Sequence, residues 1–276
     1  MAIKIDDQHR IFTLHTQNST YQMKADAQNV LLHTYYGEKT DDSDKALLFY
    51  QADRGFSGNP YEIGKRDRTY SMDSLLQEYS CFGTGDYRIT SLRVQNNDGS
   101  QAAELRYTGY RVQKGKYAIP GLPAVYANEG EAKTLVIRLA DPYSCMEVEL
   151  YYGILDEMDV ITRAVKITNQ GTKDIILKKA ASMNLDWEYG DFEWISFYGR
   201  HSMEMNFQRE GIHHGIQAIG SVRGTSSHQY NPFIILCEKG ADETMGSCYG
   251  FSFVYSGEFL IEAERDQIDR TRLICG

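Results

Sequence analysis

The chain has 276 residues, of which 42% are hydrophobic, and a formal net charge of −9. This size allows one large domain with a substantial core. The acidic balance argues against nucleic acid or an anionic membrane as a partner, because both require concentrated Lys and Arg. No apolar run approaches the roughly 20 residues of a membrane helix, and the segment from Met1 to Arg10 does not resemble a secretory signal. We therefore expect a cytoplasmic location.

The first third of the chain contains strand-like runs and little helical periodicity. Val, Ile, Thr and aromatic residues predict strands at Arg10–Leu14, Ser19–Met23 and Val30–Tyr36. The acidic run Gly37–Lys45 is typical of a solvated loop, and Met72–Tyr79 is the one candidate for a turn or two of helix.

The middle of the chain shows the clearest period of two. In the segment Met146–Tyr152, the side chains of Met146, Val148 and Leu150 fall on one face and those of Glu147 and Glu149 on the other. This alternation predicts a strand that is half exposed to water. Another strand, Leu135–Leu139, precedes it.

Two hairpins are predicted in the second half. The first joins the β-branched run Asp159–Thr168 to Asp174–Lys178 across a turn that begins at Asn169. The second joins Phe251–Tyr255 to Glu258–Glu264 across Ser256 and Gly257. Many short strands with Gly- and Asn-marked turns predict an all-β fold, namely a large two-sheet antiparallel β-sandwich.

The five cysteines are scattered along the chain without the close spacing of a metal site. Their number is odd, and buried, reduced thiols are the expected state. No phosphate-binding glycine motif or nucleophile elbow is present either. We therefore expect no metal and no cofactor.

Three polar blocks punctuated by glycine are candidates for a working surface. They are Asp53-Arg-Gly-Phe-Ser-Gly-Asn-Pro60, Glu78-Tyr-Ser-Cys-Phe-Gly-Thr-Gly-Asp-Tyr-Arg88 and Arg223-Gly-Thr-Ser-Ser-His-Gln-Tyr-Asn-Pro-Phe233. Loops that combine Gly with charged and aromatic residues are where β-scaffolds usually carry function. Each block taken alone is also compatible with a well-ordered turn.

Together with Gly199-Arg-His-Ser-Met-Glu-Met-Asn-Phe-Gln208, these blocks resemble the amino-terminal domain of the family 36 α-galactosidases. The resemblance runs from Phe12-Thr-Leu-His15 to Gln267-Ile-Asp-Arg-Thr-Arg272. One departure is Tyr230, where the family pattern leads us to expect His.

The resemblance implies that residues 1–276 form an amino-terminal β-supersandwich domain that is incomplete at its C-terminal end. Family members continue into a catalytic (β/α)8 barrel, which is absent here and supplies both catalytic aspartates. A retaining glycosidase needs two carboxyl groups about 5–5.5 Å apart. Asp186 and Asp191 lie near aromatics, but a capping or turn role explains them better. We therefore name no catalytic residue and expect this chain alone to be inactive.

The resemblance also implies substrate contacts from the first block. In this family a loop of the amino-terminal domain reaches the active site of a neighbouring subunit in a tetramer. Asp53, Arg54 and Phe56 lie in the matching loop, and Arg68 is a further candidate for the leaving-group side. The alternative is that Asp53 caps its turn and Arg68 forms a surface ion pair.

The implied function is that of a domain of a retaining α-galactosidase acting on melibiose- or raffinose-type α-galactosides. An alternative is a non-catalytic carbohydrate-binding module, because the chain contains 20 Tyr residues whose rings suit sugar stacking as well as half-buried strands. A further alternative is an oligomerisation module that contacts no sugar.

Overall fold

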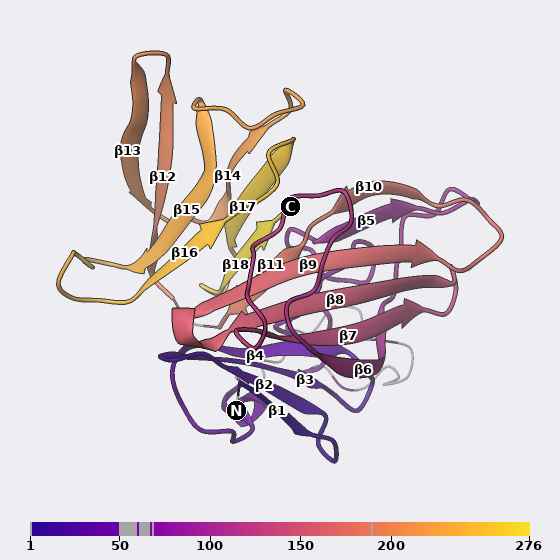
Figure 1. Cartoon of the computed structure of the whole chain (residues 1–276). Coiled ribbons are helices and arrows are strands. Elements are labelled where there is room, and N and C mark those ends of the chain that lie inside the picture. Colours follow the sequence, from indigo (N-terminus) through magenta and orange to yellow (C-terminus); the bar gives the residue numbers. More distant parts are fainter. Residues whose placement is uncertain (1, 50–59, 61–66, 68, 189) are drawn as a thin grey trace. The chain divides into compact units, whose positions relative to one another are not determined.

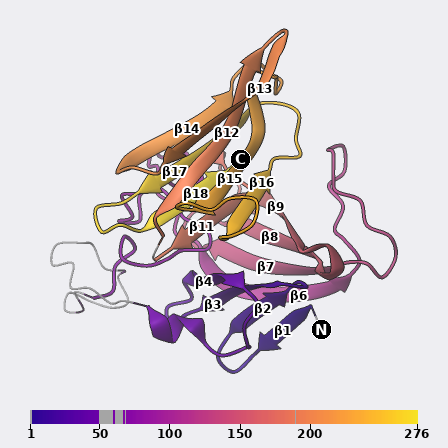
Figure 2. The same cartoon turned by 90° about the vertical axis from the view of Figure 1, so that its left-hand side faces the viewer.

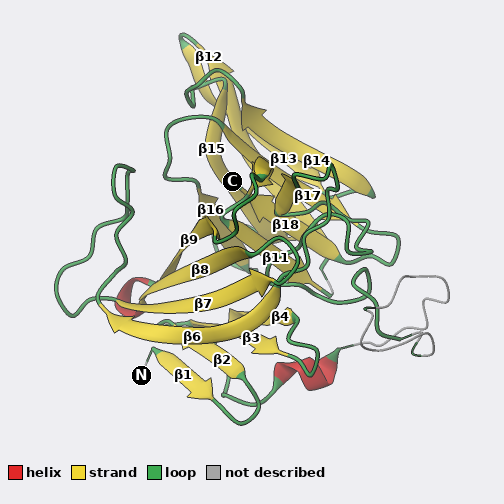
Figure 3. Ribbon diagram, turned by 90° about the vertical axis from the view of Figure 1, so that its right-hand side faces the viewer, coloured by secondary structure: helices red, strands yellow, loops and turns green. Residues whose placement is uncertain are grey.

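The structure is a computed structural model that describes residues 2–49, 60, 67, 69–188 and 190–276. The described residues form strands and only short 3₁₀ helices, among them η1 (Lys45–Leu48) and η3 (Asp156–Met158). The strands pair in antiparallel fashion, as neighbours in meanders and hairpins do. The predicted all-β antiparallel class is therefore confirmed (Figure 3). None of the described helices has the length and apolar character needed to cross a membrane.

The chain divides into two compact units (Figure 1). Unit 1 contains Met1–Ala118 and Val125–Asp186, and unit 2 contains Ile119–Ala124 and Trp187–Gly276. Strand β11 (Met183–Trp187) spans the boundary between them.

Unit 1 contains two four-stranded meanders and a two-stranded ribbon. The first meander is β1 (Ile3–Asp6), β2 (Ile11–His15), β3 (Ser19–Ala25) and β4 (Leu31–Glu38). The second is β6 (Arg106–Lys114), β7 (Lys133–Asp141), β8 (Met146–Leu155) and β9 (Val160–Asn169). The ribbon pairs β5 (Leu92–Gln95) with β10 (Ile176–Ala180). The strands predicted at Arg10–Leu14, Ser19–Met23, Val30–Tyr36 and Leu135–Leu139 are all confirmed.

The core of unit 1 lies between the two meanders, which stack on each other (Figure 2). Tyr21 of β3 and Tyr152 of β8 meet there with ring centroids 6.1 Å apart. The alternation predicted for β8 is present, since Met146, Val148 and Leu150 are all buried. Burying apolar side chains on one face of each strand is what holds such layers together.

One position on β8 departs from the simple alternation. Glu149 belongs to the polar face, yet it is only 7% exposed. Arg111 pairs with its carboxylate, and Lys166 lies 3.6 Å from it. These cations cover the acid, which explains how a charged side chain is buried on a face predicted to be wet.

Unit 2 also consists of antiparallel sheet. One sheet has the order β13 (Met203–Gly211), β12 (Phe192–Arg200), β15 (Tyr230–Glu238), β16 (Cys248–Ser252). The other contains β14 (Gly215–Ser221), β17 (Phe259–Arg265) and β18 (Thr271–Cys275). The buried side chains of unit 2 include Ile234, Leu236, Ile261 and Leu273. The described strands thus form five sheets in all, where the sequence predicted two.

Both predicted hairpins are wrong in their pairing. Three of their predicted strands correspond to β9, β10 and β17, whereas the predicted strand Phe251–Tyr255 shares only its first two residues with β16. β9 pairs with β8, whereas β10 pairs with β5 in a different sheet. In the same way β16 pairs with β15, whereas β17 pairs with β14 and β18. The connections, residues 170–175 and 253–258, are longer than the two to five residues or so of a common hairpin loop, and they carry the chain between sheets.

The segment predicted as helical is a turn. The amides of Ser74 and Leu75 both donate to the Ser71 carbonyl, at 3.0 and 3.2 Å. Leu76 is buried and Leu75 is half-buried.

Candidate functional site

The four predicted substrate-contact residues, Asp53, Arg54, Phe56 and Arg68, all lie outside the residues that the structure describes. Their role therefore stays a prediction. The described segments on either side of them, together with the second polar block, define the surroundings of the candidate site in unit 1.

The segment before residue 50 is attached to strand β3. Lys24 Nζ, on β3, lies 2.5 Å from the Asp44 carboxylate. The Lys45 amide donates to the side-chain oxygen of Gln22, also on β3, at 2.9 Å. Asp44 in addition caps η1 by accepting a hydrogen bond from the Ala46 amide. The chain is therefore anchored to β3 at residues 44 and 45, ahead of the first polar block.

The segment after residue 68 is attached to the turn between β3 and β4. The Tyr70 hydroxyl donates to Asp26, whose other carboxylate oxygen accepts the Val30 amide at 2.8 Å. Asp67 accepts both the hydroxyl and the amide of Thr69, at 2.6 and 2.9 Å, and these bonds lower the pKa of Asp67. Both described flanks of the predicted contact residues are thus anchored to the β1–β4 meander.

Glu78 opens the second polar block and is fully buried at the centre of a polar cluster. Its Oε1 accepts hydrogen bonds from the hydroxyls of Tyr21 at 2.6 Å and Tyr152 at 2.8 Å. Arg163 Nη2 lies 2.9 Å from the same oxygen, and His33 Nδ1 lies 2.9 Å from Oε2. We call these five residues the Glu78 hub. They come from β3, β4, β8, β9 and the block itself, so the hub ties both meanders of unit 1 to the block.

The hub keeps its charges although it is buried. Burial alone would raise the pKa of Glu78, but Arg163 and the bond from His33 outweigh it, so the pKa lies below its ordinary value. Burial raises the pKa of Tyr21 and Tyr152 well above the ordinary value, so both hydroxyls stay protonated donors. A buried carboxylate stays ionised when a cation and several donors surround it, as they do here.

A second buried cluster supports the far end of the block. Arg88 Nε donates to Asp86 at 2.9 Å, and its Nη2 donates to the Leu75 carbonyl at 2.7 Å. Gln77 Nε2 donates to the other Asp86 oxygen at 2.5 Å, and the Gln77 amide donates to Asp186 at 2.8 Å. Asp86 and Arg88 are only 5% and 8% exposed. The polar residues at both ends of the block are therefore internal supports.

The block also carries two exposed aromatic side chains. Tyr87 is 79% exposed, and Phe82 is 38% exposed beneath the guanidinium of Arg93, 4.4 Å from its ring centre. A cavity of about 210 Å³ is lined by other residues of the block, among them Gly83 and Thr84, together with Pro60, Glu104 and Arg106. An exposed ring on a well-supported loop presents a flat apolar face with a polar edge, which suits a sugar ring or another protein.

Gly83 is required by this loop for two reasons. Its φ of +86° lies in the region that favours glycine. A Cβ built there would also lie 2.7 Å from the Ala102 Cα, which is backbone and cannot move aside. The glycine thus allows the block to pass close to the chain before β6.

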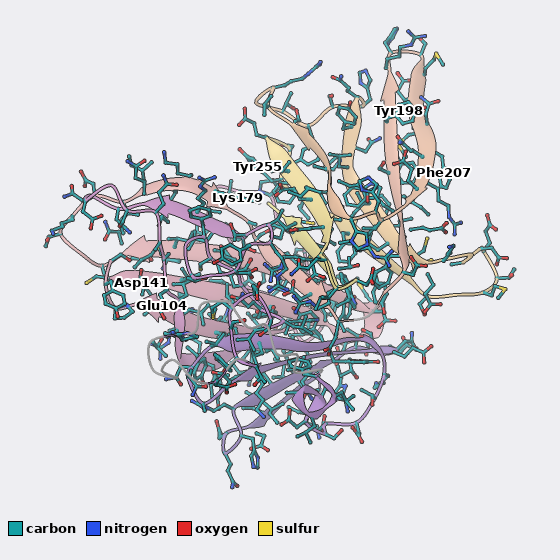
Figure 4. The ribbon with its side chains drawn as sticks, turned by 180° about the vertical axis from the view of Figure 1, so that it is seen from behind. Glu104, Asp141, Lys179, Tyr198, Phe207 and Tyr255 are labelled. Atoms are coloured by element: carbon teal, nitrogen blue, oxygen red, sulfur yellow. The ribbon has the colours of Figure 1, made fainter. Side chains whose placement is uncertain are left out.

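The third polar block lies in unit 2 and leads into β15. The Ser226 amide donates to the Ser256 carbonyl at 2.8 Å. Tyr230, at the position where the family pattern predicts His, pairs with Tyr198 of β12, and both rings are exposed by more than two-fifths. Phe207 of the neighbouring strand β13 is 59% exposed (Figure 4). The block therefore borders a surface rich in exposed aromatics.

The two carboxylates considered at the sequence level are both engaged by partners. Asp186 lies within strand β11, so the predicted turn role is wrong for it. Its carboxylate accepts a hydrogen bond from the Gln77 amide and lies 3.6 Å from Arg88 Nη1. Asp191 is well exposed and lies 3.1 Å from Arg265 Nη1. Among the described residues, no group of three or more His, Cys, Asp or Glu side chains could hold a metal ion.

The Glu78 hub is the feature that sequence reasoning missed. Its members lie far apart in the sequence, and Tyr21 and Tyr152 appear there only as ordinary strand tyrosines. The one available signal was a glutamate at the head of a block whose neighbours are uncharged.

Comparison with known proteins gives a consistent result. The family model described as the glycosyl hydrolase family 36 N-terminal domain matches residues 29–276. The chain is 55% identical over 276 residues to a bifunctional alpha-galactosidase/sucrose kinase, AgaSK, of Mediterraneibacter gnavus. It is 41% identical over 277 residues to the alpha-galactosidase AgaA of Geobacillus stearothermophilus.

Solved structures agree with this. The galactosidase domain of AgaSK superposes with a TM-score of 0.97 at 54% identity, covering 100% of this chain and 38% of that one. A G. stearothermophilus AgaA variant in complex with raffinose gives a TM-score of 0.92 at 41% identity, covering 96% of this chain and 37% of that one.

The match covers this chain fully but its relatives only in part. The chain spans 29% of the length of AgaSK and 38% of the length of AgaA. What it shares with both is the region that the family model describes. The chain therefore belongs to the N-terminal domain family of the family 36 glycosyl hydrolases.

Proposed function

We propose that this chain is the non-catalytic N-terminal domain of a retaining α-galactosidase that acts on melibiose- and raffinose-type α-galactosides. The observation that carries the proposal is the full-length match to the galactosidase domain of AgaSK at a TM-score of 0.97. In the proposed enzyme this region is a β-supersandwich that continues beyond Gly276, and the catalytic carboxylates lie in a separate barrel domain. A cytoplasmic location is part of the same proposal.

The proposed role of the domain is to deliver one loop to a neighbouring subunit's active site. Asp53 accepts hydrogen bonds from sugar hydroxyls, Arg54 donates to them, and Phe56 covers the apolar face of the ring. Arg68 contacts the leaving-group side. The anchors at Asp44 and Tyr70 support this role, because a loop that positions substrate needs fixed ends.

The direct test is Asp53→Ala in the complete enzyme. Removing a charged hydrogen-bond partner of the substrate costs about 1.5–3 kcal/mol, so kcat/KM should fall by roughly 10- to 160-fold. Asp242→Ala is the matched control, because Asp242 is an exposed aspartate that accepts the Thr244 amide in a turn of unit 2. Unchanged kcat and KM for Asp53→Ala, with Tm preserved in both variants, would remove the contact from the proposal.

A mixing experiment tests whether the loop acts between subunits. Asp53→Ala subunits are combined with subunits that lack the catalytic nucleophile, under conditions that exchange subunits. Activity above that of either parent is expected, because an intact loop then meets an intact barrel. Activity no higher than the sum of the parents contradicts delivery to a neighbour while leaving the family assignment untouched.

A specific observation favours a second candidate function, carbohydrate binding at a groove of unit 1. This groove of about 400 Å³ is lined by three loops, and its lining includes Asn97, Asp98, Tyr143, Lys173 and Asp174. Asp141 and Glu104 also line it (Figure 4). Tyr143 is 81% exposed, so its ring is free to stack on a sugar beside side chains that can bind hydroxyls.

Titration calorimetry of this chain with raffinose and stachyose tests the groove. Binding that is lost in Tyr143→Ala and retained in Tyr126→Ala supports it, since Tyr126 is 80% exposed but lies outside the groove. Equal binding by both variants, or none by the unmodified chain, rejects the groove as a sugar site.

A surface of unit 2 supports proposed oligomer formation. Strand β13 exposes Met203, Met205 and Phe207 at 50%, 57% and 59%. Neighbouring exposed apolar side chains of this size are typical of protein contacts. Phe207→Ser should therefore shift the complete enzyme from the proposed tetramer toward smaller species in analytical ultracentrifugation, and an unchanged distribution would exclude Phe207 from the contact.

A further inference from the structure

Two of the five cysteines face each other across neighbouring strands of unit 2. Cys237 lies on β15 and Cys248 on β16, and the register places them directly opposite. In an antiparallel pair, hydrogen-bonded and non-hydrogen-bonded positions alternate. The Glu238 amide donates to the Ser247 carbonyl at 2.9 Å, so the neighbouring pair is hydrogen-bonded and the cysteine pair is not.

The Phe253 amide confirms this alternation from the other end of the ladder. It donates to the Pro232 carbonyl at 2.9 Å, an even number of positions from Glu238 along β15. Non-hydrogen-bonded pairs have Cα atoms about 4.5 Å apart and the closer side chains. Disulfides span Cα separations of about 4.4–6.8 Å. The backbone therefore already holds both cysteines within disulfide reach.

The two thiols differ in their access to solvent. Cys237 is 1% exposed and packs with Ile195 and Ala241, whereas Cys248 is exposed. The sulfur of Cys237 also lies 3.7 Å from the Glu193 carbonyl oxygen as a donor. A reagent in solution can therefore reach the Cys248 thiol, whereas the Cys237 thiol beside it is shielded from solvent.

A charged pair lies beside Cys237. Glu193 stands directly opposite Cys237 in the register of β12 and β15, and Arg209 Nη2 lies 2.5 Å from the Glu193 carboxylate. Burial raises the pKa of Cys237, and Arg209 opposes this rise by stabilising the thiolate. A nearby guanidinium favours the thiolate form, which is the form that attacks a disulfide.

We propose that Cys237 and Cys248 form a reversible cross-strand disulfide by exchange with a low-molecular-weight disulfide such as oxidised glutathione. The Cys248 thiolate attacks one glutathione sulfur, and a mixed disulfide forms as the first glutathione thiolate leaves. The Cys237 thiolate then attacks the Cys248 sulfur and expels the second glutathione. Two protein thiols are oxidised and one glutathione disulfide is reduced to two thiols.

The new bond joins the two ends of the loop formed by residues 238–247. It fixes β16 to β15 covalently at one end of their ladder, next to the Glu193–Arg209 pair. A thiol reductant reverses it by the same exchange. The structure thereby assigns a redox modification site to a sheet of unit 2.

The lone exposed cysteine of unit 1 provides an internal control. Cys145 is exposed and lies in the turn between β7 and β8. Among the described residues, no cysteine stands opposite it in the ladder. The same reagent should therefore leave Cys145 as a mixed disulfide, whereas at Cys248 the mixed disulfide should be only transient.

The test treats the folded chain with graded ratios of oxidised to reduced glutathione, quenches with acid, alkylates free thiols and maps the peptides. We expect a Cys237–Cys248 cross-linked peptide, loss of two further thiols besides Cys145, and full recovery with dithiothreitol. In Cys237→Ser, a stable glutathione adduct should instead accumulate on Cys248. In Cys145→Ser, the cross-link should form as in the unmodified chain.

Other outcomes overturn the proposal. A stable glutathione adduct on Cys248 in the unmodified chain would show that Cys237 does not resolve it. Cross-links between chains, or thiols at both positions that stay free while Cys145 reacts, would equally reject an intramolecular bond. Circular dichroism of each variant confirms that the thiols were compared in folded protein.

Discussion

Each unit of this chain contains a glutamate paired with an arginine, but the two pairs lie in different surroundings. In unit 1, the side chains of Glu78 and Arg163 are 0% and 8% exposed, and two tyrosines and a histidine complete the hub. In unit 2, the side chains of Glu193 and Arg209 are 23% and 29% exposed on an open sheet. Water can replace a lost partner at the second pair and has little access to the first.

The pKa of both glutamates is lowered, but for different reasons. For Glu193 the largest cause is the hydrogen bond from Arg209, and burial is a minor opposing effect. For Glu78 burial is the largest effect and would raise the pKa, so the lowering depends on Arg163 and the bonds from His33 and Tyr21 together. A buried pair therefore depends on its whole set of partners, while an exposed pair depends mainly on one contact.

The largest expected effect is a difference in unfolding free energy when the same substitution, Glu to Gln, is made in each of the two pairs. Glu78→Gln removes the charge that compensates buried Arg163, and breaking a buried ion pair costs about 3–5 kcal/mol. Glu193→Gln leaves Arg209 with access to water and should change stability little. Urea unfolding followed by tryptophan fluorescence and circular dichroism measures both variants. Equal losses in the two variants would contradict the distinction between the pairs.

The next largest effect tests whether the stability of the second polar block depends on its backbone conformation as well as on the Glu78 hub. Gly83→Ala and Gly99→Ala both place a side chain at a φ of +86°. This conformation alone costs about 1–2 kcal/mol. Only at Gly83 does the new Cβ meet backbone, at 2.7 Å from Ala102 Cα, and such overpacking adds about 1–3 kcal/mol.

The pair of glycine variants is matched in conformation, so the difference in unfolding free energy between them isolates the close approach. Hydrogen exchange should increase at Glu78 to Arg88 in Gly83→Ala but not in Gly99→Ala. If Gly99→Ala is as destabilising as Gly83→Ala, the close approach to Ala102 contributes nothing.

The sequence could predict features that depend on neighbouring residues, but not features that depend on contacts between distant residues. Runs of β-branched and aromatic residues predicted β2, β3 and β4, and a period of two predicted β8, because both patterns are local properties of the sequence. The partner of β10 was mispredicted, because the connection at residues 170–175 is only slightly longer than a common hairpin loop and does not reveal that the chain crosses to another sheet. The Glu78 hub was missed because its contacts join residues that lie far apart in the sequence, such as Tyr21 and Arg163.

The four predicted substrate-contact residues lie outside the residues that the structure describes, so their role stays a prediction. The three polar blocks were recognised from composition, and the second proves to be supported at both ends by buried charges. Which of its side chains turn inward could not be predicted, because Glu78 and Tyr87 are both polar residues in a loop pattern. One is fully buried and the other is 79% exposed.

A smaller effect tests the neutral members of the hub. Tyr21→Phe removes only the hydroxyl that donates to Glu78 at 2.6 Å. The loss of a buried hydrogen bond to a charged group costs about 1.5–3 kcal/mol. Tyr35→Phe is the matched control, because its hydroxyl donates to the Glu38 carbonyl at 2.9 Å in an exposed position. If both variants unfold at the same urea concentration, the Tyr21 hydroxyl does not support the hub.

The smallest expected effect is a difference in acid sensitivity. The pKa of Glu78 in the folded chain lies below its ordinary value of 4.5, so its ionised form favours the folded state. That contribution is fully present above about pH 4.5, and it is lost as the pH falls through the lower folded-state pKa. Unfolding free energies measured between pH 6 and pH 3 should therefore decline more steeply for the unmodified chain than for Glu78→Gln, which cannot titrate at this position. Parallel declines would mean that Glu78 has the same pKa in the folded and the unfolded chain. The buried pair would then lose the feature that distinguishes it from the exposed one.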